Sequence, residues 1–462
     1  MGTYKENMTF ESQVRRAAEA AWNVPPGDCQ PKRYLKEPKV GELDGIVHLR
    51  DLTHLLMATT STRLDKVKED VRKLKAAEHV ERKADPSRPI VSWLITEKQL
   101  DALHVKYAAD FAVKLMTLRD FMRRCFDGSK YVARRRNYPF GSAVHPRDSS
   151  LALDDQTYVE LPLTLETRPD GQARELQASL ADVIEMVSSG ETVVMLAPFG
   201  AGKSFTAREI FLRMAKRWTD GAQASVPVVL NLRDHWGESF GDEMLERHAR
   251  ALGFVPKEEI TLGWRAGMVS LVLDGFDEIA SQVVARREDK NFMRQARLSA
   301  LAGVRDLVTK APPGSGALIS GRDHYFDSEA DLAHALGLLG KRYRIARLWE
   351  FDEAHAREFL QNNGISSTLP DWLPRKPLLL GYLAHRNLLA EVLGIDGSMG
   401  YGFVWDRFLD LVCEREASLA TSTMDPASLR SVLETLALRV RSAPDPAIKV
   451  RLIIECKNRG YI

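Results

Sequence analysis

The sequence predicts an α/β protein in three parts: a small N-terminal α/β domain, a central domain built on a parallel sheet, and helical C-terminal segments. Three observations predict this class. Apolar strand-like runs alternate with helical stretches between residues 176 and 344, which is typical of a parallel sheet. A glycine-rich turn joins the first of those runs to its helix. The 462 residues also exceed the roughly 250–300 at which one hydrophobic core stops growing.

The bulk composition is that of a globular protein and argues against several classes. Hydrophobic residues make up 44% of the chain and charged residues 28%, so disorder of the whole chain is not expected. The net charge of +2 creates no global attraction to nucleic acid or membranes, and no apolar run is long enough to span a bilayer. The four cysteines share no CxxC spacing, which argues against a disulfide framework or zinc site. The N-terminus does not resemble a signal peptide, so we expect a cytoplasmic protein without a membrane partner.

Residues 1–127 alternate helical and strand-like patterns, which predicts a small α/β domain. The expected helices span residues 8–22, 63–77, 96–108 and 118–126. The expected strands span residues 44–49, 53–59, 89–95 and 112–117.

Residues 128–175 read as a linker with one short strand at 158–163, because prolines, glycines and polar residues dominate them. Their basic run, Arg134 to Arg136, fits a solvated linker or, alternatively, a contact with nucleic-acid phosphates. Beyond the linker we expect a central domain over 176–344, a small helical domain over 345–395 and an incomplete winged-helix-like domain over 396–462. The strands expected in the central domain span residues 192–196, 226–231, 268–273 and 316–320.

The turn before the helix at 205–216 carries the chemistry of a phosphate site. Two glycines let backbone N–H groups turn toward phosphate oxygens, and the helix N-terminus adds its dipole. Lys203 supplies positive charge for the β- and γ-phosphates, and Ser204 offers a hydroxyl to Mg²⁺. The plain alternative is a glycine-rich turn that arose by chance. The residues expected to bind ATP or ADP are Pro198, Phe199, Gly200, Ala201, Gly202, Lys203 and Ser204.

Acidic residues end a second apolar strand, in the segment LVLDGFDE. Asp274 is expected to hold Mg²⁺ opposite Ser204, since this ion prefers oxygen ligands. Glu278 is expected to position the attacking water, with Asp277 as the weaker choice. Arg322 follows the next strand and is expected to reach the γ-phosphate. A solvated acidic loop and a surface arginine are the alternatives.

These segments together resemble the NACHT group of STAND nucleotide-switch ATPases. The resemblance rests on APFGAGKS, VPVVLNLRDH, LVLDGFDE and LISGRDHYF, and on KPLLLGYLA, where Pro377 matches a proline that contacts the nucleotide base or ribose. It implies that ADP or ATP with Mg²⁺ sits between the α/β domain and the helical domains. It further implies that exchange or ligand sensing drives homo-oligomer formation, and that a C-terminal sensor follows in the family.

The first 127 residues are similar to the restriction-endonuclease-like domains that precede bacterial NACHT modules. Asp44 matches the first metal-binding acid of the PD-(D/E)xK pattern, whereas Met57 and Thr59 stand where the second acid and the lysine are expected. Lys66 and Lys68 are the candidates to replace that lysine, and Glu19 is a candidate to lend a carboxylate. The domain is therefore either a nuclease with a rearranged site or a nuclease fold that binds DNA or a partner without chemistry.

The function predicted from these features is a Mg²⁺-dependent NTPase switch that controls the N-terminal effector. The resemblance implies a role in bacterial anti-phage defence, with a phage component as the unknown trigger. Two alternatives remain: an AAA+-like motor or loader acting on nucleic acid, and a DNA-binding scaffold with a degenerate nuclease domain.

Overall fold

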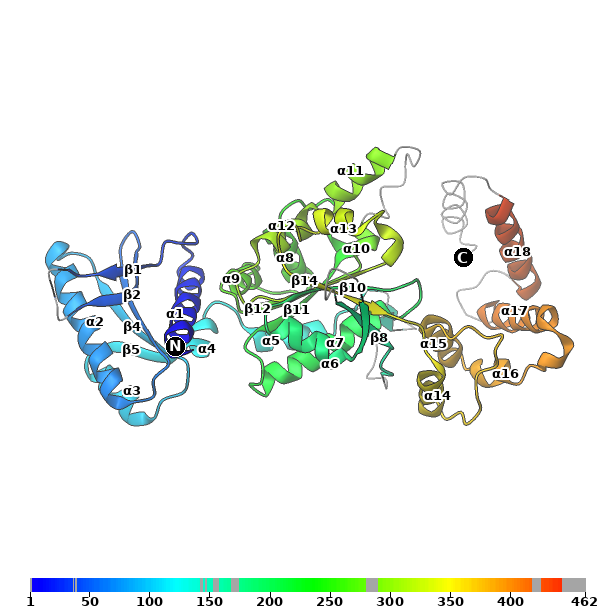
Figure 1. Cartoon of the computed structure of the whole chain (residues 1–462), viewed down its shortest axis with the longest axis horizontal. Helices are drawn as coiled ribbons and strands as arrows, with labels where there is room; N and C mark the ends of the chain where they lie inside the picture. Colours follow the sequence, from blue (N-terminus) through cyan, green and yellow to red (C-terminus); the bar gives the residue numbers. More distant parts are fainter. Residues whose placement is uncertain are drawn as a thin grey trace.

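A computed structural model describes residues 2–35, 37, 40–141, 144–145, 148–152, 158–167, 174–279, 290–417 and 425–442. The chain forms an N-terminal unit, a central unit and a run of C-terminal helices, which follow one another along the long axis of Figure 1. None of the helices in the described ranges is long and apolar enough to cross a membrane.

The N-terminal unit is a five-stranded mixed sheet in the order β1-β2-β3-β4-β5, with helices on both faces. β2 runs antiparallel to β1 and β3, whereas β3, β4 and β5 are parallel. One apolar core lies between the sheet and α2 and α3, and a second lies under α1 and α4. The strands are β1 (Gln30–Arg33), β2 (Glu42–His48), β3 (Thr53–Thr59), β4 (Ile90–Thr96) and β5 (Val113–Thr117). The helices are α1 (Gly2–Ala21), α2 (Leu64–Ala84), α3 (Ala102–Asp110) and α4 (Leu118–Met122).

The central unit contains a seven-stranded sheet in the order β11-β12-β13-β10-β14-β8-β9. The first five strands of that order are parallel, and the last two are antiparallel additions at one edge. The parallel strands β10 to β13 are buried almost throughout because helices cover both faces, and β14 is half buried. The strands are β8 (Leu163–Thr167), β9 (Arg174–Ala178), β10 (Thr192–Leu196), β11 (Val226–Asn231), β12 (Val269–Asp274), β13 (Ala317–Gly321) and β14 (Tyr343–Leu348).

Figure 1 shows α6 and α7 on one face of this sheet and α8, α12 and α13 on the other. A capping box starts α6, where Ser179 and Asp182 satisfy each other's backbone N–H groups. The helices are α5 (Gly128–Arg136), α6 (Leu180–Ser188), α7 (Lys203–Thr219), α8 (Gly241–Ala251), α9 (Glu259–Arg265), α10 (Phe276–Ile279), α11 (Lys290–Ala300), α12 (Ala302–Lys310) and α13 (Glu329–Ala335), with 3₁₀ turns η2 (Leu232–His235) and η3 (Asp323–Tyr325).

The structure corrects three expectations about the boundaries of the central unit. The segment expected as a linker contains α5, a two-stranded sheet of β6 (Val144–His145) and β7 (Asp148–Ala152), and strands β8 and β9. The strand expected at 158–163 instead begins at Leu163, because β8 pairs with β14 over that register. Residues after about 345 were expected to be helical only, yet β14 continues to Leu348 inside the sheet, between β10 and β8.

Helix α5 closes one edge of the central sheet, because its side chains bond to the backbone of edge strand β11. The Val229 N–H donates to the Tyr131 hydroxyl (2.9 Å), and the Val229 carbonyl accepts from Arg135 Nε (2.9 Å). Tyr131 and Arg135 are both fully buried. The expectation that Arg135 belongs to a solvated linker or meets phosphates is therefore wrong, since its guanidinium lies inside the fold.

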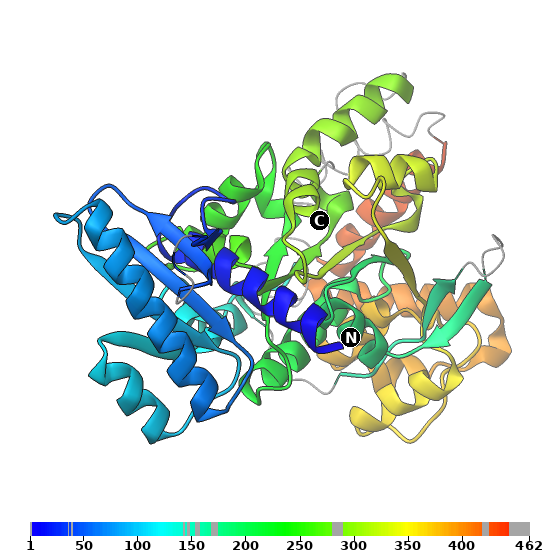
Figure 2. The same cartoon turned by 60° about the vertical axis from the view of Figure 1, so that its left-hand side comes forward.

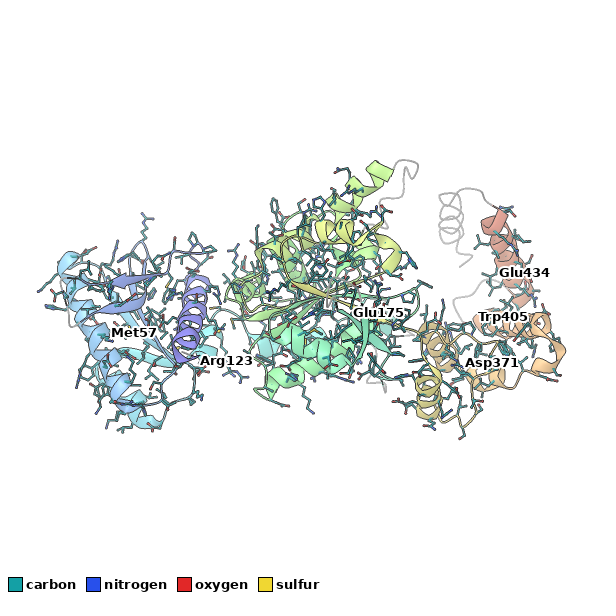
Figure 3. All side chains as sticks on the ribbon, in the orientation of Figure 1. Met57, Arg123, Glu175, Asp371, Trp405 and Glu434 are labelled. Atoms are coloured by element: carbon teal, nitrogen blue, oxygen red, sulfur yellow. The ribbon has the colours of Figure 1, made fainter. Side chains whose placement is uncertain are left out.

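The C-terminal helices are α14 (Glu353–Asn362), α15 (Pro377–His385), α16 (Leu389–Leu393), α17 (Tyr401–Ala417) and α18 (Pro426–Ser442), with a 3₁₀ turn η4 (Gly397–Met399). The ring of Trp372 packs edge-on against Trp405 and Phe408 of α17. Figure 3 labels Asp371 and Trp405 in this group of helices. Any strands of the expected winged-helix domain after residue 442 lie outside the described residues.

Candidate functional site

The turn between β10 and α7 leads directly into the first turn of α7. Gly200 and Gly202 have φ angles of +78° and +87°, which side chains rarely tolerate, so glycine is required at both positions. Gly202 is the N-cap of α7, and its carbonyl accepts from the Thr206 N–H (2.9 Å). Lys203 and Ser204 therefore occupy the first turn of a 17-residue helix, where unpaired N–H groups favour an anion.

Ser204 meets Asp274 across the carboxyl ends of the parallel strands. The Ser204 hydroxyl bonds to the Asp274 carboxylate, and Ser320 at the end of β13 donates to its Oδ1 (2.5 Å). Both Ser204 and Asp274 are buried. Burial raises the pKa of Asp274, and this rise is opposed by the two serine hydrogen bonds and by the charge of Lys203. The expected serine and aspartate thus meet, and the charge of Lys203 lies near enough to act on the aspartate.

The other acidic residues and Arg322 lie beside this pair. Asp277, on the short helix α10 after β12, pairs with Arg322 through Arg322 Nε and Asp277 Oδ2 (2.8 Å). The guanidinium of Arg322 also lies 5.0 Å from the centroid of the exposed Phe199 ring, which belongs to the glycine-rich turn. Burial, together with Asp274 and Asp277, raises the pKa of Glu278. A carboxyl with a raised pKa is suited to taking a proton from water.

Helix α15 reaches the turn from the C-terminal side. The Leu378 N–H donates to the Gly200 carbonyl (3.0 Å). Pro377 is the first residue of α15, and its Cβ lies 3.6 Å from where a Cβ on Gly202 would be. Pro377 therefore lies against the glycine-rich turn, and its contact with a nucleotide, which the resemblance implies, stays a prediction.

The oxygen ligands at Ser204 and Asp274 fit a divalent cation that is shared with a nucleotide. The described residues include no group of three or more His, Cys, Asp or Glu side chains that could hold a metal by themselves. Mg²⁺ in nucleotide sites is commonly held by one or two protein oxygens, with substrate phosphates and water completing its shell. A buried hydroxyl beside a buried carboxylate supplies that partial set.

Gly141 lies directly against this pair, although it comes from the segment before β8. A Cβ on Gly141 would lie 2.5 Å from Ser204 Oγ and 2.6 Å from Asp274 Oδ2. The Gly141 N–H donates to Oδ1 of the buried Asn231 (3.0 Å), the last residue of β11. Asn231 is the register partner of Asp274 in the neighbouring strand.

The sequence does not reveal Ser320, Gly141 or Asn231 as part of this site. Ser320 and Asn231 lie inside LISGRDHYF and VPVVLNLRDH, two of the segments that support the family resemblance. No pattern within those segments singles out either residue. Gly141 carries no signal, because its position depends on contacts with strands far along the chain.

The N-terminal candidate Asp44 has a structural use in this fold. Its Oδ2 accepts from the Ala58 N–H (2.7 Å), and burial raises its pKa to about 7. Met57 lies in the apolar core beneath α2 and is labelled in Figure 3, and Thr59 is buried as well. These positions supply no second acid or lysine to Asp44.

The substitutes considered for the missing nuclease residues have partners other than Asp44. Lys66 pairs with the fully buried Asp70 on α2 (2.9 Å), and Lys68 lies over the Tyr107 ring (5.4 Å). Glu19 Oε1 accepts from the Gly27 and Cys29 N–H groups (2.8 and 3.1 Å), which shapes the loop after α1. A nuclease role for Asp44 therefore stays a prediction.

A separate cavity of about 730 Å³ lies between the N-terminal and central units. Its walls include Phe10, Arg119, Trp218, Val226 and Met268. Val226 and Met268 mark the amino ends of β11 and β12, whereas ligands of open parallel sheets bind at the carboxyl ends. The cavity is therefore distinct from the Ser204–Asp274 site.

No protein-family model matches the chain, and no curated protein matches it. Among solved structures it is similar to the ORC1 protein of Aeropyrum pernix in complex with DNA, at 14% identity and TM-score 0.30 over 60% of this chain and 76% of that one. The Aeropyrum pernix ORC2 protein in ADPNP–ADP complexes matches at 14% identity and TM-score 0.28, over 61% and 74%. A STAND signal-transduction ATPase with a tetratricopeptide-repeat sensor, from Pyrococcus horikoshii, matches at 11% identity and TM-score 0.24, over 63% of this chain and 40% of that one.

Proposed function

We propose that the protein binds ATP, or a closely related nucleoside triphosphate, with Mg²⁺ and hydrolyses it as a conformational switch. The observation that carries this proposal is the meeting of Ser204 and Asp274 beside Lys203, at the end of a glycine-rich turn. Ser204 and Asp274, from two separate segments, converge there on one oxygen-rich point at a helix N-terminus, with the charge of Lys203 nearby. That convergence fits a triphosphate and its metal better than it fits a solvated loop.

Each residue has a distinct part in this proposal. The backbone N–H groups of the turn and the Lys203 ammonium hold the phosphates. Bound Mg²⁺ would neutralise charge on the β- and γ-phosphate oxygens. Glu278 orients the attacking water and accepts its proton, and the raised pKa of its carboxyl suits that task. Arg322 leaves Asp277 to contact the γ-phosphate, so its salt bridge reports whether a triphosphate is present.

Replacing Lys203 tests the site directly. Lys203→Ala removes the positive charge at the helix N-terminus, so ATP affinity should fall by about a hundredfold or more in a calorimetric titration. Lys216→Ala is the matched control, because Lys216 is an exposed lysine in the last turn of the same helix. Unchanged affinity in Lys203→Ala would remove the basis of the proposal.

The rate and stimulation of hydrolysis separate a switch from a motor. A switch should retain its nucleotide and turn over slowly, whereas an AAA+-like motor or loader should be fast and stimulated by a nucleic-acid polymer. Figure 2 shows the C-terminal helices lying beside the central unit, and α15 of this group contacts the proposed phosphate loop. We propose that this contact opens on activation, allowing a homo-oligomer to form.

The resemblance to NACHT proteins supports a finer proposal, in which the switch controls the N-terminal unit in bacterial anti-phage defence. Phage plating on cells that carry the wild type or Lys203→Ala tests this role, and equal plating on both would count against it. Nuclease output is tested by plasmid cleavage with Mg²⁺, which should be absent in Asp44→Ala. If activated wild type leaves the plasmid intact, the N-terminal unit instead serves as a binding module for DNA or a partner.

A further inference from the structure

The segment between α5 and Gly141 connects the edge of the central sheet to the proposed metal pair. Arg135 donates to the Tyr138 and Pro139 carbonyls (2.8 and 3.2 Å) and to Asn231 Oδ1 (3.1 Å). Its guanidinium also stacks 3.7 Å from the centroid of the Phe140 ring. The segment 138–140 is thereby fixed over the carboxyl end of β11.

Asn231 is the point at which this segment meets the site. Its Oδ1 accepts from both Arg135 and the Gly141 N–H, and its Nδ2 donates to the Pro139 carbonyl (3.0 Å). The side chain is buried, so each of these hydrogen bonds would be costly to leave unmade. Gly141 is therefore held in one place relative to β11, and through the strand register relative to Asp274.

Gly141 lies directly against the oxygens of the Ser204–Asp274 pair. Its φ is +52°, and a Cβ there would approach Ser204 Oγ and Asp274 Oδ2 more closely than real contacts allow. The lack of a side chain thus lets the Gly141 backbone approach these two oxygens closely, and any Cβ there would have to displace them. A left-handed glycine that is bonded to Asn231 at this position fits a role in placing backbone directly against the pair.

We infer that Gly141 is a positioning residue for the metal: held by Asn231, it forms the outer wall of the Ser204–Asp274 pair and sets how readily a divalent cation joins the nucleotide there. This inference rests on the proposed nucleotide function.

The test compares nucleotide binding with and without Mg²⁺ in Gly141→Ala. A fluorescent ATP analogue is titrated in Mg²⁺ and again in EDTA. Metal and nucleotide affinities are coupled reciprocally, so Mg²⁺ should strengthen wild-type binding by about tenfold or more. Gly141→Ala should bind in EDTA within about twofold of wild type, while the Mg²⁺ enhancement falls to about threefold or less.

Gly340→Ala is the control for backbone strain, because Gly340 also has a left-handed φ (+75°) but no heavy atom within 4 Å of the place that an alanine Cβ would take. It should keep the full Mg²⁺ enhancement. Asn231→Ala removes the acceptor of the Gly141 N–H without adding an atom at the Ser204–Asp274 pair. If Gly141→Ala does not fold, the Mg²⁺ enhancement measured in Asn231→Ala tests the inference instead. A smaller loss of the Mg²⁺ enhancement is expected for it.

The outcomes separate this inference from the proposed function. Wild type that binds no nucleotide in either buffer would defeat the proposed function itself. Wild type with a clear Mg²⁺ enhancement that Gly141→Ala retains would overturn only the role of Gly141. Equal loss of binding in both buffers would show that Gly141 supports the fold and not the metal.

Discussion

At the scale of single residues, the site is made of groups whose chemistry depends on burial. Asp274 is held by two serine hydroxyls, and Asp277 by the Arg322 guanidinium. The second oxygen of Asp277, Oδ1, is buried without a hydrogen-bond partner in the described part of the chain. An unsatisfied carboxylate oxygen beside the proposed γ-phosphate position is costly, so a bound water or ion would be favoured there.

Glu278→Gln should separate binding from hydrolysis. The amide keeps the size of the side chain but cannot take a proton, so hydrolysis should slow by about a hundredfold or more while ATP affinity stays within about twofold. Steady-state phosphate release and calorimetry measure the two quantities. Glu243→Gln, at an exposed position in α8, is the control. Hydrolysis at the wild-type rate would transfer the water-positioning role to Asp277.

Asp44→Asn should change how stability depends on pH. The folded pKa of Asp44 is raised to about 7, so the folded state binds an extra proton, and stability falls as pH rises from about 4 to 7. The asparagine can still accept from the Ala58 N–H and carries no charge. At pH 8 its free energy of unfolding in urea should therefore exceed that of wild type by roughly 2 kcal/mol after allowance for partial exposure, whereas at pH 4 the two proteins should be about equally stable. An equal difference at both pH values would contradict the assignment.

The phosphate loop could be predicted from the sequence because its residues are adjacent in the chain. Gly200, Gly202, Lys203 and Ser204 carry their spacing and their strand–helix context within a few residues. Ser320 and Gly141 could not be assigned, because their roles arise from strand order and register. Ser320 lies on the strand next to that of Asp274, and Gly141 comes 133 residues before Asp274 in the chain. Their contacts with Asp274 can be recognised only once the order and register of the strands are known.

At the scale of elements, the attachment of α5 to β11 shows how side chains can replace a missing strand. An edge strand leaves backbone groups unpaired, and here Tyr131 and Arg135 bond to the N–H and carbonyl of one residue, Val229. Burial of the Arg135 guanidinium lowers its pKa to about 10, which still leaves it charged at neutral pH. Three backbone carbonyls and Asn231 compensate for burying that charge.

Tyr131→Phe should test the strength of this attachment. The change removes the hydroxyl that accepts from the Val229 N–H and bonds to His248 Nε2 (2.9 Å). Leaving a buried N–H unpaired should lower the free energy of unfolding by about 1–3 kcal/mol in urea titrations. Tyr107→Phe, a partly buried tyrosine of the N-terminal unit, should have little effect. Equal losses in the two variants would mean that the hydroxyl bond to Val229 contributes nothing particular.

The elements that sequence reasoning misplaced are those whose identity depends on neighbours. The α5 segment is rich in arginine and reads as exposed, but β11 offers its buried arginine a set of acceptors. Strand β14 contains Arg344 and Arg347 and lacks a clean apolar run, yet β10 and β8 pair with it on both sides. The strands β10 to β13 are predictable because apolar residues dominate each of them.

At the scale of the whole molecule, the N-terminal unit is joined to the central unit by packed contacts as well as by the chain. Helix α1 contacts α9, and Arg16 donates to the Pro313 carbonyl (3.4 Å). Phe126, just after α4, packs so closely on Gly263 of α9 that a Cβ there would clash with its ring. Under the proposed switch, these packed contacts would be the route by which a change in the central unit acts on the N-terminal unit.

The covering of β11 by α5 also bears on how the chain can be shortened. A protein that begins at residue 128 keeps Tyr131 and Arg135 over Val229 and should remain monodisperse in light scattering. One that begins at residue 142 uncovers a bare strand, and bare strands recruit further copies side by side. A truncated protein should therefore keep α5, because a truncation that removes α5 should aggregate through the exposed edge of β11.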